Sequence, residues 1–558
     1  HVAGYPPAID AGVQSIMASF SSWNGMKMLG SKRLLTDVLK RRMDFQGFIV
    51  GDWNAQGQIP GCSNDDCPAA FNSGADMLMA PDSWRGLYQH TLAEVKSGVI
   101  PMARLDDAVA RILRVKFRMG LFTAAAPSAQ PLARTSDQVV GNAAHRAVAR
   151  RAVRESLVLL KNDNGLLPLD PHKQILVAGE GADNISQQNG GWTLTWQGTG
   201  LTNSDFPGAQ SIGAGIAAQV NAAGGSTEIA ADGHYTRKPD VAVVVFGETP
   251  YAEFQGDIAN LQFSPGDDHD LELIRSLRAQ GIPVVALFLS GRPLWVNREI
   301  NAANAFVAGG LPGSEGGGVA DVLLRKADGQ IDHDFHGKLA FAWPGTAVSG
   351  AGVPQFPLDY GLTYADHGML QELPEQSGVS GNQVRAGDYL EKGKAVDGYT
   401  LVLTDAVGKT VTVNAMPVAT ADKSLRMTAL DYKAQEDARR LEWMGAAASL
   451  SIASANPLDL DRQTNGDVML VVTLRLDASS TGAVWIGMRC GHDCKGRVDV
   501  SHALKPANWE RIGIPLKCLQ ASGANMRHIM EPFVIDAGKG VRLDVSNVML
   551  GMNPDQVI

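Results

Sequence analysis

Four short apolar runs constrain the fold of this chain more than any other feature, because each is rich in Val, Ile, Leu or Ala and ends on glycine. They read QILVAGEG, VAVVVFGE, IPVVALFLSG and NAFVAGG, and all lie between residues 174 and 310. Strands that are apolar on both faces belong to parallel sheets that helices cover on both sides. Helical spacing at 144–162 and 270–281 supplies such helices. The pattern predicts an α/β sandwich domain with a parallel sheet over 144–366.

The first part of the chain alternates strand and helix signals in the same way. Apolar strand-like runs lie at 12–20, 47–50 and 75–80, and amphipathic helical spacing lies at 31–43 and 103–122. This makes only about three βα units, whereas a (β/α)₈ barrel needs roughly 250 residues. We therefore expect residues 1–122 to form the back half of a TIM-like barrel.

The last part of the chain has a different texture. Segments such as TLVLTD, VMLVVTLRLD and VRLDVSNVML alternate apolar and polar residues between turn signals, which is typical of antiparallel strands. We expect a jelly-roll-like β-sandwich over 395–558. Two stretches, 123–143 and 367–394, are expected to be linkers between the three domains.

Charge and hydropathy exclude some partners. The net charge of −9 argues against binding to nucleic acid or to an anionic membrane surface. Apolar runs such as VAVVVF are far too short to cross a bilayer, so no membrane insertion is expected.

The five cysteines fall into two close pairs and one single residue. Cys62 and Cys67 enclose a polar loop, Cys490 and Cys494 enclose another, and Cys518 stands alone. Zinc thiolates usually come with a CxxC spacing that neither pair has, so disulfides in an oxidising compartment are favoured. We expect no metal and no cofactor.

Acidic residues follow two of the predicted strands. Gly51, Asp52 and Trp53 follow the run at 47–50, and the stretch 246–257, FGETPYAEFQGD, carries three acids. Ligands bind at the carboxyl ends of strands in both barrels and open α/β sheets. Two carboxylates are the apparatus of glycoside hydrolysis, but acids at strand ends also cap helices and tie loops. The residues alone leave both interpretations open.

Longer motifs indicate a family. The segments SFSSWNGMKMLGSKRLLTDVL and FQGFIVGDW resemble the barrel of the glycoside hydrolase family three β-glucosidases and β-glucan exohydrolases. Seven later segments resemble the second domain of that family, in the same order. They are RRAVRESLVLLKNDNGLLPL, GWTLTWQG, GETPYAEFQGD, SGRP, LPGSEGGGVADVLL, GKLAFAWP and YGLTY. The resemblance covers residues 1 to about 366. The C-terminal domain resembles the β-domain of bacterial exo-1,3/1,4-β-glucanases in the family.

The resemblance assigns catalytic roles. Asp52 in GDW matches the catalytic nucleophile, and Glu253 in GETPYAE matches the acid/base of the β-glucan exohydrolase branch. Trp53 and Trp196 match the aromatic pair that clamps the sugar of the next subsite. Met17 matches a residue that lines the pocket.

Three positions depart from the family pattern. Phe20 stands where the plant exohydrolases have a tyrosine beside the nucleophile. Asn54 and Gln58 replace an acid and an arginine, which alters the leaving-group subsite.

The resemblance implies a retaining, exo-acting β-glucosidase or exo-β-glucanase. It would release glucose from the non-reducing end of β-1,3- and β-1,4-gluco-oligosaccharides, and its partner would be such a β-glucan. The alternatives are a β-xylosidase of the same family or a non-catalytic carbohydrate-binding fragment, because the upstream barrel strands are absent. His1 is no initiator methionine, so we expect a missing N-terminal barrel segment in a periplasmic or secreted bacterial protein.

Other conspicuous residues have simpler interpretations. Glu315 is expected to cap a helix, and Glu248 to fix the loop near the acid/base. His492 is expected to be a loop residue, and Trp485 and Trp509 to be core or stacking residues.

Overall fold

The structure, a computed structural model, describes residues 2–558 apart from 254, 259, 265–266, 351, 380–386, 397, 434–435, 467, 492–493 and 553. The chain forms two compact units. The first contains residues 1–134, 389–550 and 554–558, and the second contains residues 135–388 and 551–553. No helix in the described part of the chain combines the length and apolar character needed to cross a membrane.

The second unit is built on a six-stranded sheet in the order β6-β11-β10-β9-β7-β8. Its strands are β6 (Val158–Asn162), β7 (Gln174–Ala178), β8 (Ser226–Ile229), β9 (Val241–Gly247), β10 (Val284–Leu289) and β11 (Ala305–Gly310). All neighbours pair in parallel except β6, which runs antiparallel to β11. The parallel sheet predicted from the apolar runs is therefore confirmed, with one antiparallel edge strand.

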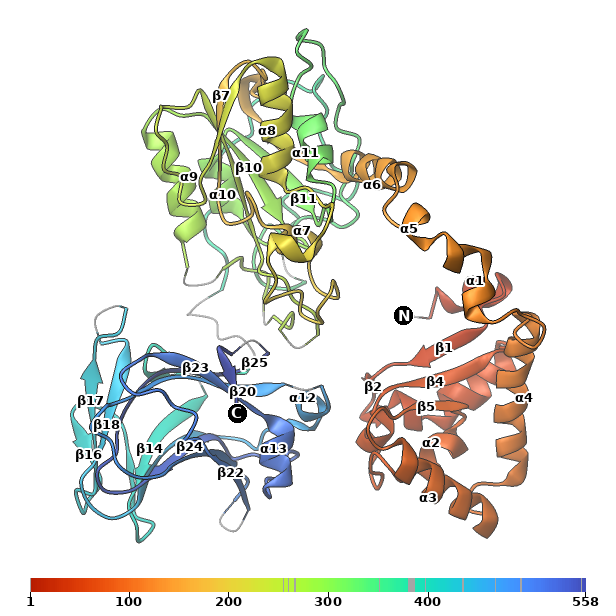
Figure 1. The fold of residues 1–558 in the computed structure, drawn as a ribbon, viewed down its shortest axis with the longest axis vertical. Helices are drawn as coiled ribbons and strands as arrows, with labels where there is room; N and C mark the ends of the chain where they lie inside the picture. The colour runs from red at the N-terminus through yellow and green to blue at the C-terminus, as the bar shows by residue number, and fades with distance from the viewer. Residues whose placement is uncertain are drawn as a thin grey trace. The chain divides into compact units, whose positions relative to one another are not determined.

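Helices cover both faces of this sheet (Figure 1). They are α8 (Ile212–Ala223) and α11 (Gly316–Leu323) on one face, and α9 (His269–Ala279) and α10 (Asn297–Ala302) on the other. The unit also contains α6 (Ala143–Ser156) and α7 (Ile185–Asn189). One core cluster joins alternate strand residues to α8 and α11, and a second joins the other strand residues to α9 and α10. Val243 and Val244 in β9 are both fully buried, one in each cluster.

The prediction of one helix over 144–162 is wrong. The helix α6 ends at Ser156, and the apolar residues that follow form β6. All five residues of β6 are buried, and Lys161 Nζ donates to the carbonyls of Ile300 and Ala303 at 3.0 and 2.7 Å. A short apolar run next to a helix has no period of its own, so the register with β11 decides its conformation.

The N-terminal segment of the first unit contains a three-stranded parallel sheet in the order β1-β4-β5. The strands of the segment are β1 (Ser15–Ala18), β2 (Ser22–Trp23), β3 (Met26–Lys27), β4 (Phe48–Trp53) and β5 (Met77–Met79). Its helices are α1 (Tyr5–Asp10), η1 (Met28–Gly30), η2 (Arg33–Arg42), η3 (Ala55–Gln58), α2 (Pro68–Ser73), α3 (Trp84–Ser97) and α4 (Met102–Arg118). The helix expected at 31–43 is wound as a π-helix, and the one expected at 103–122 ends at Arg118.

Short helical turns occupy the stretch 123–143: η4 (Pro127–Ala129), η5 (Pro131–Arg134) and α5 (Ser136–Val139). Two short strands, β12 (Asp388–Glu391) and β13 (Lys394–Ala395), begin inside the 367–394 stretch. The domain boundaries themselves stay predictions.

The C-terminal segment of the first unit has two mainly antiparallel sheets (Figure 1). One contains β12, β13, β16 (Val418–Ala419), β17 (Leu425–Leu430), β18 (Ala438–Trp443), β20 (Met469–Leu476), β23 (Glu510–Pro515), β25 (Arg542–Gly551) and β26 (Gln556–Val557). The other contains β14 (Tyr399–Thr404), β15 (Thr410–Thr412), β19 (Ala448–Ser454), β21 (Val484–Arg489), β22 (Lys495–Asp499) and β24 (Glu531–Ala537). The helices α12 (Asp461–Asn465) and α13 (Leu516–Ala521) complete this β domain.

The two tryptophans of interest in the β domain are only half-buried. An arginine lies over each ring, Arg497 over Trp485 at 4.6 Å and Arg475 over Trp509 at 5.1 Å. Neither tryptophan is a fully buried core residue.

Candidate active site

Asp52 lies at the carboxyl end of β4, the central strand of the three-stranded sheet. β4 pairs with β1 from Ser15 opposite Phe48 to Ala18 opposite Gly51, and with β5 on its other side. The Asp52 carboxylate is half-buried, and its Oδ1 accepts a hydrogen bond from the backbone N–H of Trp53 at 2.7 Å. The parallel ladder therefore fixes the backbone that carries this side chain.

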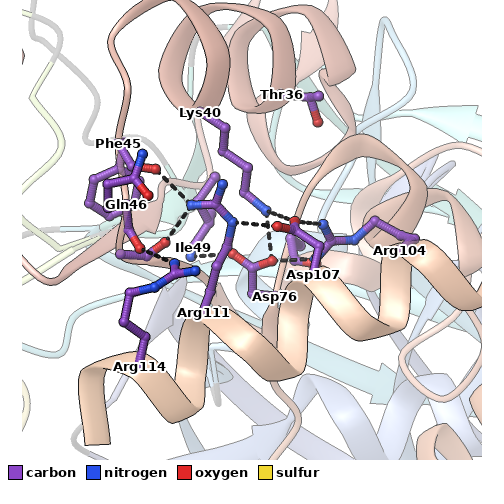
Figure 2. A network of polar contacts seen from close by, with 12 residues as sticks. Thr36, Lys40, Phe45, Gln46, Ile49, Asp76, Arg104, Asp107, Arg111 and Arg114 are labelled. Carbon is purple, nitrogen blue, oxygen red and sulfur yellow. Dashed lines mark hydrogen bonds and ion pairs between the residues drawn. The ribbon is translucent and has the colours of Figure 1, made fainter. Parts of the chain in front are cut away.

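A buried charge network fixes the start of the same strand (Figure 2). Asp76, which directly precedes β5, accepts from Lys40 Nζ at 2.6 Å and from the backbone N–H of Ile49 at 2.8 Å. Arg104 on α4 also donates to Asp76. The Asp76 side chain is fully buried and the Lys40 side chain nearly so, which makes each the necessary partner of the other.

The helix α4 extends this network to the loop before β4. Arg111 donates to the carbonyl oxygens of Phe45 and Gly47 at 2.6 and 2.9 Å, and to Asp107 at 2.9 Å. Burial alone would raise the pKa of Asp107, but the charges of Lys40 and Arg111 and the hydrogen bonds from Arg111 and Arg104 lower that pKa to about 2. Burial lowers the pKa of Lys40.

Two other predicted site residues come from the chain around β1. Met17 pairs with Val50 of β4 in register and is half exposed, at 50%. Phe20 is partly buried and packs against the core of the N-terminal segment. Trp53, at the end of β4, is 42% exposed. Met17 therefore lies on the strand beside that of Asp52, Trp53 lies on the same strand as Asp52, and Phe20 follows the end of β1. Their contacts with a sugar stay predictions.

The chain after Trp53 turns sharply into an ordered loop. Asn54 adopts a left-handed conformation with φ of 52° and is buried, as is Gln58. Gln56 donates to the carbonyl of Asn64 at 2.9 Å. The predicted disulfide between Cys62 and Cys67 is present and closes this loop, and a second disulfide joins Cys490 to Cys494.

Glu253 lies in the second unit, on the loop that follows β9. Its Oε2 accepts two hydrogen bonds, from the indole N–H of Trp192 at 3.0 Å and from that of Trp196 at 2.7 Å. Trp196 was expected from its position in the motif GWTLTWQG to clamp a sugar. Trp192 was missed, although two tryptophans four residues apart in a glycine-bounded loop were a visible signal.

The loops that carry Glu253 and the tryptophans are interlocked. Buried Gln197 accepts from the backbone N–H of Ala252 at 2.7 Å and donates to the carbonyl of Glu253 at 3.1 Å. A Cβ atom at Gly191 would stand 2.0 Å from the carbonyl oxygen of Tyr251, so only glycine permits this close approach.

Glu248 anchors the base of the Glu253 loop. Its Oε1 accepts from Arg292 through Nη2 at 2.7 Å and through Nε at 3.0 Å, and its Oε2 accepts from Ser290 at 2.6 Å. The Arg292 guanidinium also lies over the Tyr251 ring at 4.2 Å. Burial and the neighbouring Glu248 charge raise the pKa of Tyr251 to about 12. Glu248 therefore fixes the loop, as predicted.

Glu315 and His492 were expected to be a helix cap and a loop residue. Glu315 stands at the N-terminus of α11, but its side chain makes no capping bond to the described residues and instead pairs with Arg146 at 3.0 Å. His492 lies outside the described residues. In the part of the chain that the structure describes, no group of three or more His, Cys, Asp or Glu side chains is arranged to hold a metal ion.

The chain matches three domain models in succession. Residues 1–115 match the glycosyl hydrolase family 3 N-terminal domain, and residues 157–364 match the C-terminal domain of the same family. Residues 398–550 match a galactose-binding domain-like model.

Individual relatives agree with these matches. The lysosomal beta glucosidase of Dictyostelium discoideum is 32% identical over 390 residues, which is 65% of this chain and 45% of the relative. The periplasmic beta-glucosidase of Salmonella typhimurium is 31% identical over 374 residues, 61% of this chain and 47% of the relative. The chain therefore spans about half the length of these curated relatives.

A solved structure extends the similarity over the whole chain. The exo-1,3/1,4-beta-glucanase (EXOP) from a Pseudoalteromonas species is 41% identical, with a TM-score of 0.66, and the match covers 100% of this chain and 69% of that one. The chain therefore belongs to glycosyl hydrolase family 3.

Proposed function

We propose that this chain is part of a retaining, exo-acting β-glucosidase or exo-β-glucanase in which Asp52 is the nucleophile and Glu253 the acid/base. The observation that carries the proposal is that the Glu253 carboxylate accepts hydrogen bonds from two indole N–H groups. The ion pair between Glu248 and Arg292 holds the base of the same loop. A carboxyl group that transfers protons to and from a substrate must be held within hydrogen-bond reach of the reacting atom, and these contacts fix the position of Glu253. Asp52 at a strand end is the matching carboxylate of the first unit.

The proposed reaction has two steps. Asp52 attacks the anomeric carbon of the terminal glucose, while Glu253 donates a proton to the departing glycosidic oxygen. Glu253, now a carboxylate, then removes a proton from water, which attacks the same carbon and releases glucose from Asp52. Two inversions give net retention of the β configuration.

The topology of the N-terminal segment supports the proposal that the strand carrying Asp52 belongs to a (β/α)₈ barrel. The three strands of the segment's parallel sheet are adjacent in the order β1-β4-β5, and helical segments lie between them in the chain. We propose that residues 1–122 are the carboxyl-terminal part of a (β/α)₈ barrel, with Asp52 at the catalytic face, since active sites lie at the carboxyl ends of barrel strands.

The substrate and location are proposed from the relatives and the cysteines. The Pseudoalteromonas relative is an exo-1,3/1,4-beta-glucanase, which supports β-1,3- and β-1,4-gluco-oligosaccharides as substrates. The Salmonella relative is periplasmic, and disulfides persist in oxidising compartments. Both support a periplasmic or secreted bacterial protein.

The activity is tested on the intact protein with laminaribiose and cellobiose, by following the released sugar with NMR. We expect β-glucose to form first and mutarotate later, with release from the non-reducing end only. A first-formed α-glucose would contradict the retaining assignment. Preference for an aryl β-xyloside over the β-glucoside would make the protein a β-xylosidase, and failure on every glycoside would leave a carbohydrate-binding role.

The acid/base assignment is tested by Glu253→Ala with added azide. The variant should still cleave 2,4-dinitrophenyl β-glucoside, whose leaving group needs no proton, but should turn over slowly because water is no longer deprotonated. Azide needs no base, so it should restore turnover and give β-glucosyl azide. An α-glucosyl azide would show that the two carboxylates have each other's role.

A further inference from the structure

We propose that Trp192, acting together with Trp196, is a positioning residue that reserves one oxygen of Glu253, Oε1, for the transferred proton. The inference rests on the proposed function, because it assigns a task to an acid/base at Glu253. It adds a residue to the site and gives Trp196 a second task besides stacking on a sugar.

The hydrogen bonds to Glu253 are unevenly distributed. Both indole N–H groups donate to Oε2, at 3.0 Å from Trp192 and 2.7 Å from Trp196. A carboxylate oxygen has two lone-pair sites, so these donors fill the acceptor capacity of Oε2. Among the described residues, no group donates to Oε1. A proton on Oε2 would displace one of the indoles, whereas a proton on Oε1 displaces nothing.

The backbone of the tryptophan loop holds the two donors in this arrangement. Trp192 and Leu194 both have φ of 60°, a left-handed conformation that is uncommon for large side chains. The loop is closed by a 2.7 Å hydrogen bond from the N–H of Trp192 to the carbonyl of Trp196. The two indole centroids are 6.1 Å apart with planes inclined by 49°, which lets the edges of both rings reach one oxygen.

The exposure of Trp192 also indicates a role outside the core. Its side chain is 70% exposed, so neither burial nor packing explains why an indole occupies this position. The hydrogen bond that its ring N–H donates goes to Glu253.

The proton and electron balance follows from this arrangement. In the first step the Oε1–H bond breaks and its proton goes to the glycosidic oxygen, which leaves with the electrons of the C1–O bond while Asp52 bonds to C1. Glu253 is then a carboxylate with Oε2 still held by both indoles. In the second step Oε1 takes a proton from water as the water oxygen bonds to C1 and the Asp52–C1 bond breaks.

The test compares leaving groups in Trp192→Phe, which keeps an aromatic ring and removes the N–H. Misdirected proton donation should lower kcat/KM on laminaribiose about tenfold, a fraction of the ~10²–10⁴ that general acid catalysis provides. On 2,4-dinitrophenyl β-glucoside, which needs no proton, kcat/KM should change less than about threefold. Because the side chain is exposed, the variant should fold, which thermal unfolding verifies. Equal losses on both substrates, or no loss on laminaribiose, would overturn the inference.

Two further measurements separate this inference from the proposed function. Trp295→Phe is the matched control, since Trp295 is buried in the same unit and its indole N–H has no partner among the described residues; it should lower stability without altering the ratio of the two kcat/KM values. If Glu253→Ala shows the leaving-group difference and Trp192→Phe does not, only the inference fails. If Glu253→Ala shows no such difference, the acid/base assignment fails, and the inference with it. A crystal structure of the intact protein with the indoles on different oxygens of Glu253 would also refute it.

Discussion

The two carboxylates assigned to catalysis are held in two different ways. Asp52 is part of a strand, and its backbone is fixed by ladder bonds on both sides and by the buried charges of Asp76, Lys40 and Arg104 behind it. Glu253 lies on a loop, and its position depends on side chains that reach it from the tryptophan loop.

This difference predicts different consequences of mutation. Supports of a strand are shared with the core, so their loss should first lower stability. Supports of the Glu253 loop are few and local, so their loss should first lower activity on substrates that need a proton. The following predictions test this contrast, from the largest expected effect to the smallest.

The largest effect should separate the two carboxylates themselves. Asp52→Asn should lower kcat by about 10⁴-fold or more on every substrate, because no other group can form the covalent intermediate. Glu253→Ala should spare dinitrophenyl glucoside in the first step. Asp44→Asn, an exposed acid near the start of β4, is the control and should retain full activity. If Asp52→Asn lost activity only on substrates whose leaving group needs a proton, the predicted difference between Asp52 and Glu253 would be wrong.

The next largest effect should come from the charge network behind β4. Asp76→Ala leaves the buried Lys40 ammonium without its main partner, so the free energy of unfolding should fall by about 3–5 kcal/mol. Chemical denaturation measures this change. The matched control is Asp37→Ala, which breaks an exposed ion pair with Arg41 and should cost no more than about 0.5 kcal/mol. Equal costs for the two variants would mean that the network does not support the strand.

A smaller effect is expected from the link between the two loops. Gln197→Ala removes the side chain that bonds Ala252 and Glu253, so it should cost about 2 kcal/mol of stability. It should also lower kcat/KM on laminaribiose more than on dinitrophenyl glucoside. Gln330→Ala, at an exposed position of the same unit, should change neither quantity. A loss of stability with unchanged kcat/KM on both substrates would contradict the view that the Glu253 loop depends on such side chains.

The smallest effect concerns Glu299, a buried acid that belongs neither to the charge network behind β4 nor to the contacts of the Glu253 loop. Burial raises the pKa of Glu299 from 4.5 to about 7. The folded state therefore keeps a proton that the unfolded state releases, and stability falls as pH rises from about 4.5 to about 7 and stays lower above that.

Glu299→Gln removes this penalty, so it should stabilise the protein at pH 8 and have little effect at pH 4. Thermal unfolding at the two pH values measures the difference. Glu272→Gln, on the exposed side of α9, should behave alike at both. A stabilisation by Glu299→Gln that is equal at both pH values would exclude titration of Glu299 as its cause.

Much of the second unit was predictable from its apolar runs. β7, β9, β10 and β11 each coincide with a run of Val, Ile, Leu or Ala, because strands buried on both faces need such residues throughout. β6 was not predictable, since its residues continue directly from the helix α6. β8 is only four residues long and two of its residues are exposed, so it carries little pattern.

The candidate site divides in the same way. The positions of Asp52 at the end of β4 and of Glu253 after β9 were visible as acids that follow apolar runs. The donors to Glu253 were not, because Trp192 lies 61 residues away and reaches it only through a left-handed backbone.

By itself, the sequence determined which segments must be buried, where the acids follow strands, and which cysteines are close enough to pair. These properties depend on composition and spacing, which the hydrophobic effect and the short reach of a loop convert directly into structure. The tertiary structure alone decided that β6 runs antiparallel, that Asp76 meets Lys40 and the N–H of Ile49, and that two indoles meet one oxygen of Glu253. A hydrogen bond depends on distances of a few tenths of an ångström and on direction, and only the folded backbone sets these for residues far apart in the chain.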